Sequence, residues 1–261
     1  MVEARTWLTL VSSSEHGSLR TPSLDNRAVP DAVLELRNLG HRYGEFEALR
    51  DLSLSLHAGE CMALIGHNGS GKTTAVRMIA GLLEITSGEV EIAGAGVGDE
   101  AARAATAVVL DTPALYDDLT VFEHLELVAL AHGVVGDDLD DRAAELLVRL
   151  GLDAKGDSRP TSLSRGMRQK VSLACALVRP FSLLVLDEPV VGLDPASQRT
   201  LRELIAESVR DGAAVLLTTH QLEFARGIAG RGLMLADGEV VADGPYDAVI
   251  DGELVRGRGL V

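Results

Sequence analysis

The feature that most constrains the fold is a short glycine-rich segment between an apolar run and a segment of helical periodicity. The apolar run from Cys61 to Ile65 predicts a buried strand, and the pattern from Lys72 to Leu82 predicts a helix. The segment between them has the spacing G-x-x-x-x-G-K-[ST] and consists of Gly66, His67, Asn68, Gly69, Ser70, Gly71, Lys72 and Thr73. A strand, a tight loop and a helix in this order are the context in which that spacing forms a phosphate-binding loop.

The residue types of this segment suit the binding of a nucleoside triphosphate. Glycines let the backbone wrap tightly, so that successive N–H groups point at phosphate oxygens, and the helix start adds the positive end of its dipole. We predict that Lys72 reaches the β- and γ-phosphates, that the Thr73 hydroxyl ligates Mg²⁺, and that the nucleotide contacts extend to Thr74. The alternative is a glycine-rich turn with a chance lysine, but lysine occurs only three times in the 261 residues.

Composition and charge limit the classes of protein to which the chain can belong. With 46% hydrophobic but only 3% aromatic residues, the chain can bury one large core or two modest ones, filled mainly by aliphatic side chains. The net charge of −15 disfavours nucleic acid as a partner, because an acidic surface repels a phosphate backbone. A single bound nucleotide needs only a local positive site, so the charge does not argue against ATP.

Two further features bear on where the protein works. Cys61 and Cys175 lie far apart in apolar stretches and have no metal-ligand spacing, so we expect buried, unreactive thiols and a reducing cytosol. No apolar run approaches the roughly 18 residues of a membrane span. We therefore expect a chain that is soluble alone and associates with a membrane only through a partner.

Hydropathy patterns predict two kinds of sheet. Residues 1–31 have little periodicity, and we expect a mobile extension there. Alternating apolar and polar residues predict half-buried antiparallel strands at 33–36, 52–56 and 89–92. Continuous apolar runs predict a parallel sheet covered on both faces, with strands at 62–65, 107–110, 183–186 and 215–217.

The middle of the chain is predicted to be helical, and the end returns to strands. The pattern indicates helices at 121–131 and 139–150, a loop at 157–161, and a helix beginning near Ser164. After Arg231 we predict two short strands joined at Asp237-Gly238, followed by a short helix. The fold class is α/β: a phosphate-loop core with a mostly parallel sheet, an antiparallel β-subdomain and a helical subdomain at about 112–180, in one domain over 32–261.

A second candidate site lies at the end of the apolar strand 183–186. Asp187 and Glu188 follow it directly, and a carboxylate at a strand tip beside a phosphate loop is placed to hold Mg²⁺. We assign that role to Asp187, and we predict that Glu188 accepts a proton from an attacking water. The alternative is a pair of solvated acids at a strand end.

Several motifs in a fixed order carry a resemblance to a known family. The phosphate loop is followed by Leu163-Ser164-Arg165-Gly166, then Asp187-Glu188-Pro189, then Gly192-Leu193-Asp194, and then a lone His220 after a strand. Over about residues 33–250 the chain resembles the ATP-binding cassette ATPases. The family works as a head-to-tail dimer with two ATP molecules between the subunits, so the resemblance implies ATP and Mg²⁺ as cofactors.

The resemblance also implies roles for single residues. Tyr43 resembles the aromatic residue that stacks on adenine, and His220 resembles the histidine that hydrogen-bonds the γ-phosphate; a packing tyrosine and a structural histidine are the alternatives. Ser164, Gly166 and Met167 would contact the nucleotide of the other subunit from a helix start. The segment 191–194 resembles the loop that communicates across the dimer, although Asp194 is equally suited to cap a helix.

The chain departs from the common family pattern at several positions. Asp111 stands where the family usually has Gln; Asp can also ligate Mg²⁺, but it is shorter and adds a negative charge. Arg165 and Met167 replace the third and fifth residues of Leu-Ser-Gly-Gly-Gln, a form that resembles exporters of drugs, sodium and polysaccharides. Residues 113–122 correspond to the groove for a membrane subunit, where Leu115, Tyr116 and Phe122 are candidate contacts; packing of the helical lobe is the alternative.

Together these features predict the ATP-hydrolysing subunit of an exporter. It would power a separate transmembrane permease subunit from the cytoplasmic face of the membrane, as a homodimer or heterodimer, with no nucleic acid partner. The alternatives are a soluble cassette ATPase of the ribosome-associated or DNA-repair kind, and a regulatory cassette that hydrolyses weakly. A GTPase is disfavoured, because no lysine lies in an Asn/Thr-Lys-x-Asp context.

Overall fold

The computed structural model describes residues 32–252, which form two compact units. Of the described residues, 32–111, 181–189 and 202–252 belong to the first, here called the sheet unit. The second, here called the helical unit, comprises 112–180 and 190–201. The predicted extension at 1–31 lies outside the described residues.

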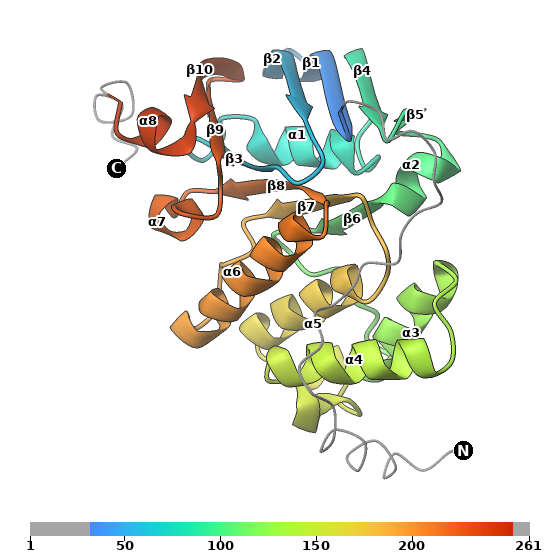
Figure 1. Cartoon of the computed structure of the whole chain (residues 1–261). Coiled ribbons are helices and arrows are strands. Elements are labelled where there is room, and N and C mark those ends of the chain that lie inside the picture. Colours follow the sequence, from blue (N-terminus) through green and yellow to red (C-terminus); the bar gives the residue numbers. More distant parts are fainter. Residues whose placement is uncertain (1–31, 253–261) are drawn as a thin grey trace. The chain divides into compact units, whose positions relative to one another are not determined.

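The sheet unit contains an antiparallel sheet of four strands, in the order β2-β1-β4-β5 (Figure 1). These strands are β1 (Leu34–Tyr43), β2 (Phe46–Leu56), β4 (Ser87–Ile92) and β5 (Ala95–Gly96). Leu34 lies opposite Leu56 on one side and Ile92 on the other, and all three are buried. The alternating patterns predicted β4 and parts of β1 and β2, because one face of this sheet is covered and the other is not. They made β1 and β2 too short and did not predict β5.

The second sheet of this unit has six strands in the order β10-β9-β3-β8-β7-β6; β10 pairs with β9 antiparallel, and every other pair of neighbours is parallel. The strands are β3 (Cys61–Ile65), β6 (Thr106–Val109), β7 (Leu183–Asp187), β8 (Ala214–Thr219), β9 (Arg231–Ala236) and β10 (Glu239–Pro245). Every residue of β3, β7 and β8 is buried, as the continuous apolar runs predict. Because β8 lies between β3 and β7, their carboxyl ends meet at one edge of the sheet.

Helix α1 (Lys72–Ile79) lies between the two sheets and contributes to one hydrophobic core with both of them (Figure 1). Leu34 from the antiparallel sheet, Met62 and Leu216 from the parallel sheet, and Met78 from α1 are all excluded from solvent. The unit also holds the short helices α2 (Glu100–Ala105), α7 (Leu222–Ala225) and α8 (Tyr246–Ile250). Because α1 is buried in this core, the position of its first residue, Lys72, is fixed after the loop that follows β3.

The helical unit is built from α3 (Val121–Ala131), α4 (Asp137–Arg149), α5 (Arg165–Leu177) and the start of α6 (Pro195–Arg210). A capping box starts α3: Thr120 accepts from the Glu123 N–H, and Glu123 accepts from the Thr120 N–H. The predicted loop at 157–161 is wrong in part, because η3 (Pro160–Ser162) forms a turn of 3-10 helix; another, η2, spans Asp153–Lys155. Proline at the first position of η3 favours that turn, since its φ is fixed at a helical value.

The two cysteines differ in exposure. Cys61 is buried as predicted, whereas Cys175 is partly exposed, so the prediction of two buried cysteines is wrong for this residue. Cys175 lies three residues after Ser172 on the same side of α5, and Ser172 is also partly exposed. Burial nevertheless raises the pKa of both thiols to about 12, so both are protonated and poorly nucleophilic. Within residues 32–252, every helix is too short or too polar to cross a membrane.

Candidate nucleotide-binding and hydrolysis site

The glycine-rich loop joins the carboxyl end of β3 to the start of α1, and its shape depends on two kinds of glycine. Gly66, Gly69 and Gly71 have positive φ values of 153°, 84° and 106°. A Cβ on Gly66 would lie 2.3 Å from the Leu235 carbonyl oxygen, and one on Gly71 would lie 2.7 Å from that of Ala48. Gly69 has nothing within 4 Å of a Cβ, so its backbone angle alone favours glycine.

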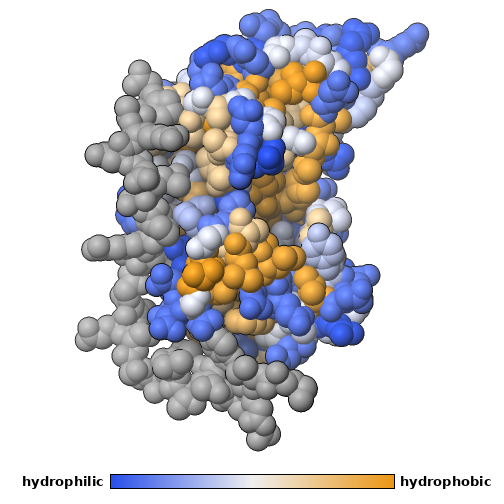
Figure 2. Space-filling view, turned by 90° about the vertical axis from the view of Figure 1, so that its right-hand side faces the viewer, coloured by the Kyte–Doolittle hydropathy of each residue, from blue (hydrophilic) through white to orange (hydrophobic). Residues whose placement is uncertain are grey.

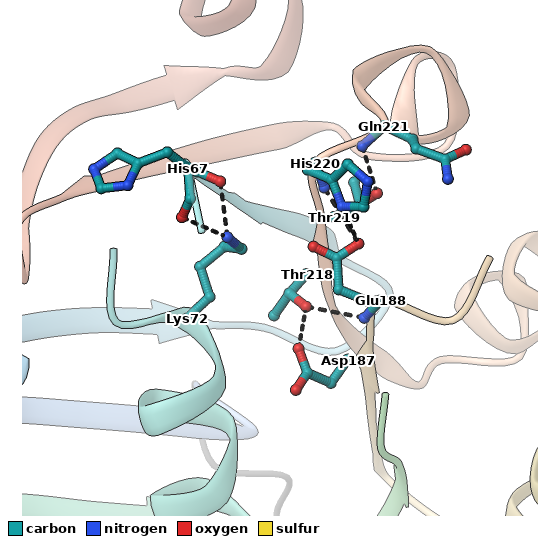
Figure 3. Close-up of polar contacts among 9 residues, drawn as sticks. His67, Lys72, Asp187, Glu188, Thr218, Thr219, His220 and Gln221 are labelled. Atoms are coloured by element: carbon teal, nitrogen blue, oxygen red, sulfur yellow. Dashed lines mark hydrogen bonds and ion pairs between the residues drawn. The ribbon is translucent and has the colours of Figure 1, made fainter. Parts of the chain in front are cut away.

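Lys72 folds back over the loop from the first position of α1 (Figure 3). Its ammonium group donates to the Gly66 carbonyl at 2.7 Å and to the His67 carbonyl at 3.1 Å. Burial lowers the pKa of Lys72, while the nearby carboxylates of Glu188 and Asp187 oppose that shift. The loop therefore holds a buried cation on its own backbone oxygens, where a phosphate group can compete for it.

A hairpin turn supports the loop from outside. The Gly238 N–H donates to the Ser70 carbonyl at 3.2 Å, and the Gly238 carbonyl accepts from the Arg50 N–H at 2.8 Å. The His67 ring lies 3.7 Å from the Asp237 carboxylate. The sequence predicts the turn at Asp237-Gly238 correctly but not this role, because a turn motif does not indicate which distant segment it contacts.

Asp187 ends β7 and is fully buried. Its Oδ1 accepts from the Thr218 hydroxyl at 2.5 Å, whereas its Oδ2 is buried without a hydrogen-bond partner. Burial raises the pKa of Asp187, as do the negative charges of Asp111 and Glu188, and the Thr218 and Thr73 hydroxyls oppose the shift. A partnerless carboxylate oxygen among like charges is a place that a cation would stabilise.

Glu188 follows in a strained conformation, with a φ of 47°, which is uncommon for residues other than glycine. Its N–H donates to the backbone oxygen of Thr218 at 3.2 Å and to the hydroxyl at 3.1 Å. Its carboxylate accepts from the His220 ring at 2.9 Å and from the His220 N–H at 3.3 Å (Figure 3). The structure thus pairs two residues that the sequence predicts separately, and backbone strain is typical of functional positions.

The residues present fit Mg²⁺ only if a nucleotide supplies further ligands. Within residues 32–252, no group of three or more His, Cys, Asp or Glu side chains is arranged to hold a metal ion by itself. Asp187 has its unpartnered oxygen, the Thr73 hydroxyl lies near it, and Asp111 is close enough to influence its charge. Mg²⁺ commonly takes one or two carboxylates together with substrate phosphates and waters, so this sparse set suits it.

Two other predicted site residues lie at the ends of strands in the sheet unit. Tyr43 ends β1 and is 46% exposed, with its ring edge-on to His41 at 4.5 Å between centroids. Because the Tyr43 ring is partly exposed and its neighbour meets it edge-on, the ring can stack on a base. Asp111 lies two residues after β6 and is partly exposed.

The helical unit brings together the other two predicted segments, Ser164–Met167 and 191–194. The Ser164 hydroxyl caps α5 by accepting from the Met167 N–H at 3.3 Å. A Cβ on Gly166 would lie 2.3 Å from the Gly192 carbonyl oxygen, so the backbones of the two segments touch. Asp194 accepts from Ala196 and Ser197 at the start of α6, as the capping interpretation predicts.

A second contact joins these two segments. The Lys170 ammonium group on α5 lies 3.6 Å from the Asp194 carboxylate. Of the two, Lys170 is the less exposed side chain, with 15% exposure against 58% for Asp194. The helix start at Ser164 and the loop before α6 are therefore held together by a backbone contact and an ion pair.

A glycine cradle at the end of a central parallel strand, with an acid pair on another strand of that sheet, defines a phosphate-loop ATPase. Comparisons with known proteins show to which family within this class the chain belongs. The family described as "ABC transporter" matches residues 49–191. A solved "ATP binding subunit of ABC transporter" superposes with a TM-score of 0.78 at 37% identity, over 87% of this chain and 94% of that one.

Curated relatives give the same result. The ABC-type transporter ATP-binding protein EcsA of Bacillus subtilis is 34% identical over 82% of this chain and 87% of its own length. The SkfA peptide export ATP-binding protein SkfE of Bacillus subtilis is 34% identical, over 81% and 88%. A Nod factor export ATP-binding protein I, from Burkholderia orbicola, is 35% identical, over 85% and 74%. The chain belongs to the ABC transporter family and is an ATP-binding, ATP-hydrolysing subunit of a transporter.

Proposed function

We propose that the chain powers an exporter: two ATP-binding subunits close on two ATP molecules and thereby drive a separate membrane-spanning subunit. The direction of transport is supported by two named relatives, a peptide export protein and a Nod factor export protein. The Ser164-Arg165-Gly166-Met167 form, which resembles the exporter branch, agrees with them. The observation that carries the ATPase part is the Glu188 carboxylate held by His220 in the same unit as the loop that holds Lys72.

The roles proposed for the sheet unit follow from its contacts. Residues Gly66 to Thr74 surround the phosphates, and Lys72 exchanges its carbonyl partners for phosphate oxygens. Glu188 accepts the proton of the attacking water, and His220, which already binds the Glu188 carboxylate, contacts the γ-phosphate. Tyr43 stacks on the adenine ring.

Thr73 and Asp187 hold Mg²⁺, with Asp111 nearby as a third oxygen ligand. When bound, the ion neutralises the negative charge that develops on the phosphates. The unpartnered Oδ2 of Asp187 and the two negative charges near it, those of Asp111 and Glu188, support this assignment.

The helical unit contributes to the nucleotide of a second copy or of a related subunit. Ser164 caps a helix of 13 residues, and Gly166 and Met167 lie in its first turn, where N–H groups and the helix dipole favour an anion. A contact that forms only when two subunits meet converts nucleotide binding into subunit movement, and hydrolysis reverses it.

The membrane-spanning partner is proposed to dock on the helical unit. Hydrophobic side chains gather over this unit in Figure 2. Leu127 and Leu130, three residues apart on α3, are 46% and 51% exposed, and Tyr116 is 66% exposed. Exposed apolar groups of this kind favour a protein partner, and an amphipathic helix of a permease at the cytoplasmic face of the membrane fits them.

Affinity purification from detergent-solubilised membranes tests the proposal. We expect the tagged chain to recover a multi-span membrane protein, and less of it from a Leu127→Glu/Leu130→Glu variant. A matched variant, Glu203→Gln, changes an exposed residue of α6 and keeps the yield. Recovery of ribosomes in place of a membrane protein would overturn the exporter assignment and favour a soluble cassette ATPase.

A further inference from the structure

A buried threonine on β8 stands between the phosphate loop and the acid pair. Thr218 has no solvent-exposed surface, and it is in register with Leu64 on β3 and with Asp187 on β7. Buried strand residues in such a sheet are mostly aliphatic, as Leu216 and Leu217 are on the same strand. A hydroxyl at this position needs partners, because burying it without them is costly.

The partners of this hydroxyl are the two acids of the site. As donor, the Thr218 hydroxyl makes its one hydrogen bond to Asp187 Oδ1, at 2.5 Å. As acceptor, it receives the Glu188 N–H at 3.1 Å, and the Thr218 carbonyl shares that N–H at 3.2 Å. One side chain therefore contacts the carboxylate of Asp187 and the backbone of Glu188 at once (Figure 3).

These contacts determine which oxygen of Asp187 is available to a ligand and where the Glu188 carboxylate lies. With Oδ1 of Asp187 occupied, Oδ2 is the oxygen left buried without a partner. At Glu188, two acceptors from Thr218 hold the N–H of a residue whose φ of 47° is unfavourable for a side chain. In that conformation the Glu188 carboxylate reaches the His220 ring at 2.9 Å.

We propose that Thr218 is a positioning residue for ATP hydrolysis: its hydroxyl orients Asp187 toward the metal–nucleotide complex and fixes the Glu188 backbone so that the general base is held in place. The inference rests on the proposed roles of Asp187 and Glu188. Partners that orient ligating carboxylates commonly change metal affinity 10- to 100-fold when removed. A misplacement of about 1 Å in a catalytic group can cost about 100-fold in rate.

The test compares three variants of the full chain. Thr218→Val keeps the shape and removes the hydroxyl, and Thr218→Ser keeps the hydroxyl. Thr106→Val is the matched control, because Thr106 is a buried threonine at the start of β6 whose hydroxyl donates to the Ala102 carbonyl at 2.7 Å. Each is measured for kcat and KM with ATP and Mg²⁺, for thermal unfolding, and for ATP affinity by calorimetry with Mg²⁺ and with a chelator.

For Thr218→Val we expect kcat to fall about 10- to 100-fold while KM changes much less. The gain in ATP affinity that Mg²⁺ provides should shrink by about 10-fold, with the affinity in chelator unchanged. Thr218→Ser should stay within about threefold of wild type, and Thr106→Val should lower only the Tm. If Thr218→Val does not fold, Thr218→Cys, with a weak thiol donor, takes its place in the comparison.

The outcomes separate this inference from the proposed function. A folded Thr218→Val with wild-type kcat and a wild-type gain from Mg²⁺ would overturn the inference alone. A Thr106→Val variant with the same loss of kcat would also overturn it, since the effect would then come from general destabilisation. A wild-type chain that does not hydrolyse ATP would contradict the proposed function, and the inference with it.

Discussion

The sheet unit and the helical unit both contain candidate nucleotide-binding groups, but the groups differ in how well they are satisfied. In the sheet unit, the Ser70 hydroxyl and Asp187 Oδ2 are buried without partners, and the Lys72 ammonium group binds carbonyls of its own loop. In the helical unit, the Ser164 hydroxyl already caps α5, and Asp194, which belongs to the loop 191–194 and not to the predicted nucleotide contacts, caps α6.

This difference indicates which of the two units binds the nucleotide first. Buried polar groups without partners gain most when a ligand satisfies them, because their desolvation cost is already part of the folded state. The Ser164 hydroxyl is already engaged as an acceptor, so it has only its own proton left to donate to a nucleotide. We therefore expect the sheet unit to bind ATP by itself, and the helical unit to add a weaker contact that matters when two subunits meet.

The largest expected effect tests the chemistry of the sheet unit. Glu188→Gln should lower ATP turnover about 100- to 10,000-fold, because an amide cannot act as the general base. ATP affinity should remain, and an ATP-bound dimer should accumulate, visible by size-exclusion chromatography with light scattering. Glu203→Gln, on the exposed side of α6, is the control and should keep its turnover. Undiminished turnover in Glu188→Gln would refute the general-base assignment.

The next effect tests binding by the phosphate loop. Lys72→Ala should weaken ATP binding about 10- to 100-fold in calorimetry, since a charge-assisted hydrogen bond contributes roughly 1.5–3 kcal/mol. Lys155→Ala provides the comparison, because Lys155 is exposed in the helical unit. Equal affinities for the two variants would mean that the charge of the loop does not hold the nucleotide.

A smaller effect separates the two regions. Ser164→Ala should leave ATP affinity of the single chain within about threefold of wild type, yet reduce the ATP-dependent dimer. Loss of the cap should lower the free energy of unfolding by about 0.5–2 kcal/mol. Thr120→Ala removes the cap of α3 instead, so it should cost similar stability and spare the dimer. If Ser164→Ala abolished ATP binding by the isolated chain, the order of events inferred from the comparison would be wrong.

The smallest effect concerns Asp194 and pH. Hydrogen bonds from the Ser197 hydroxyl and backbone hold the pKa of Asp194 well below its usual value, with help from Lys170. A carboxyl whose pKa is depressed by folding stabilises the protein above its unfolded pKa of about 3.9 and loses that contribution as the pH falls toward the folded value. The Tm difference between wild type and Asp194→Ala should thus be constant from pH 7 to about pH 5 and shrink below it. A difference that stays the same at pH 3 would contradict this.

Much of the fold could be predicted from the sequence because local patterns carry it. The helix predicted at 121–131 has these bounds in the structure, and the strand before the phosphate loop ends at Ile65 as expected. The prediction was less exact where a local signal was weak. The predicted strand at 107–110 runs from Thr106 to Val109, and the helix predicted to reach Leu82 ends at Ile79.

Some site residues could likewise be predicted from local motifs, and others could not. Spacing alone indicated Lys72, Asp187 and Glu188, because each belongs to a motif that is contiguous in the chain. A contiguous motif predicted Gly238 as a turn residue, but no such motif indicates the contacts of Gly238 or of Thr218, because their partners lie far away in the sequence. Both roles became recognisable only from the hydrogen bonds that the folded chain makes.

Chain-local information thus specified the loop that receives phosphates, the acids at the end of a buried strand, and the alternation that distinguishes the two sheets. Only the folded molecule decided that β8 lies between β3 and β7, that a threonine hydroxyl joins Asp187 to Glu188, and that His220 meets the same glutamate. The reason is physical: periodicity and glycine content act over a few residues, whereas strand order is decided by the burial of whole elements against one another.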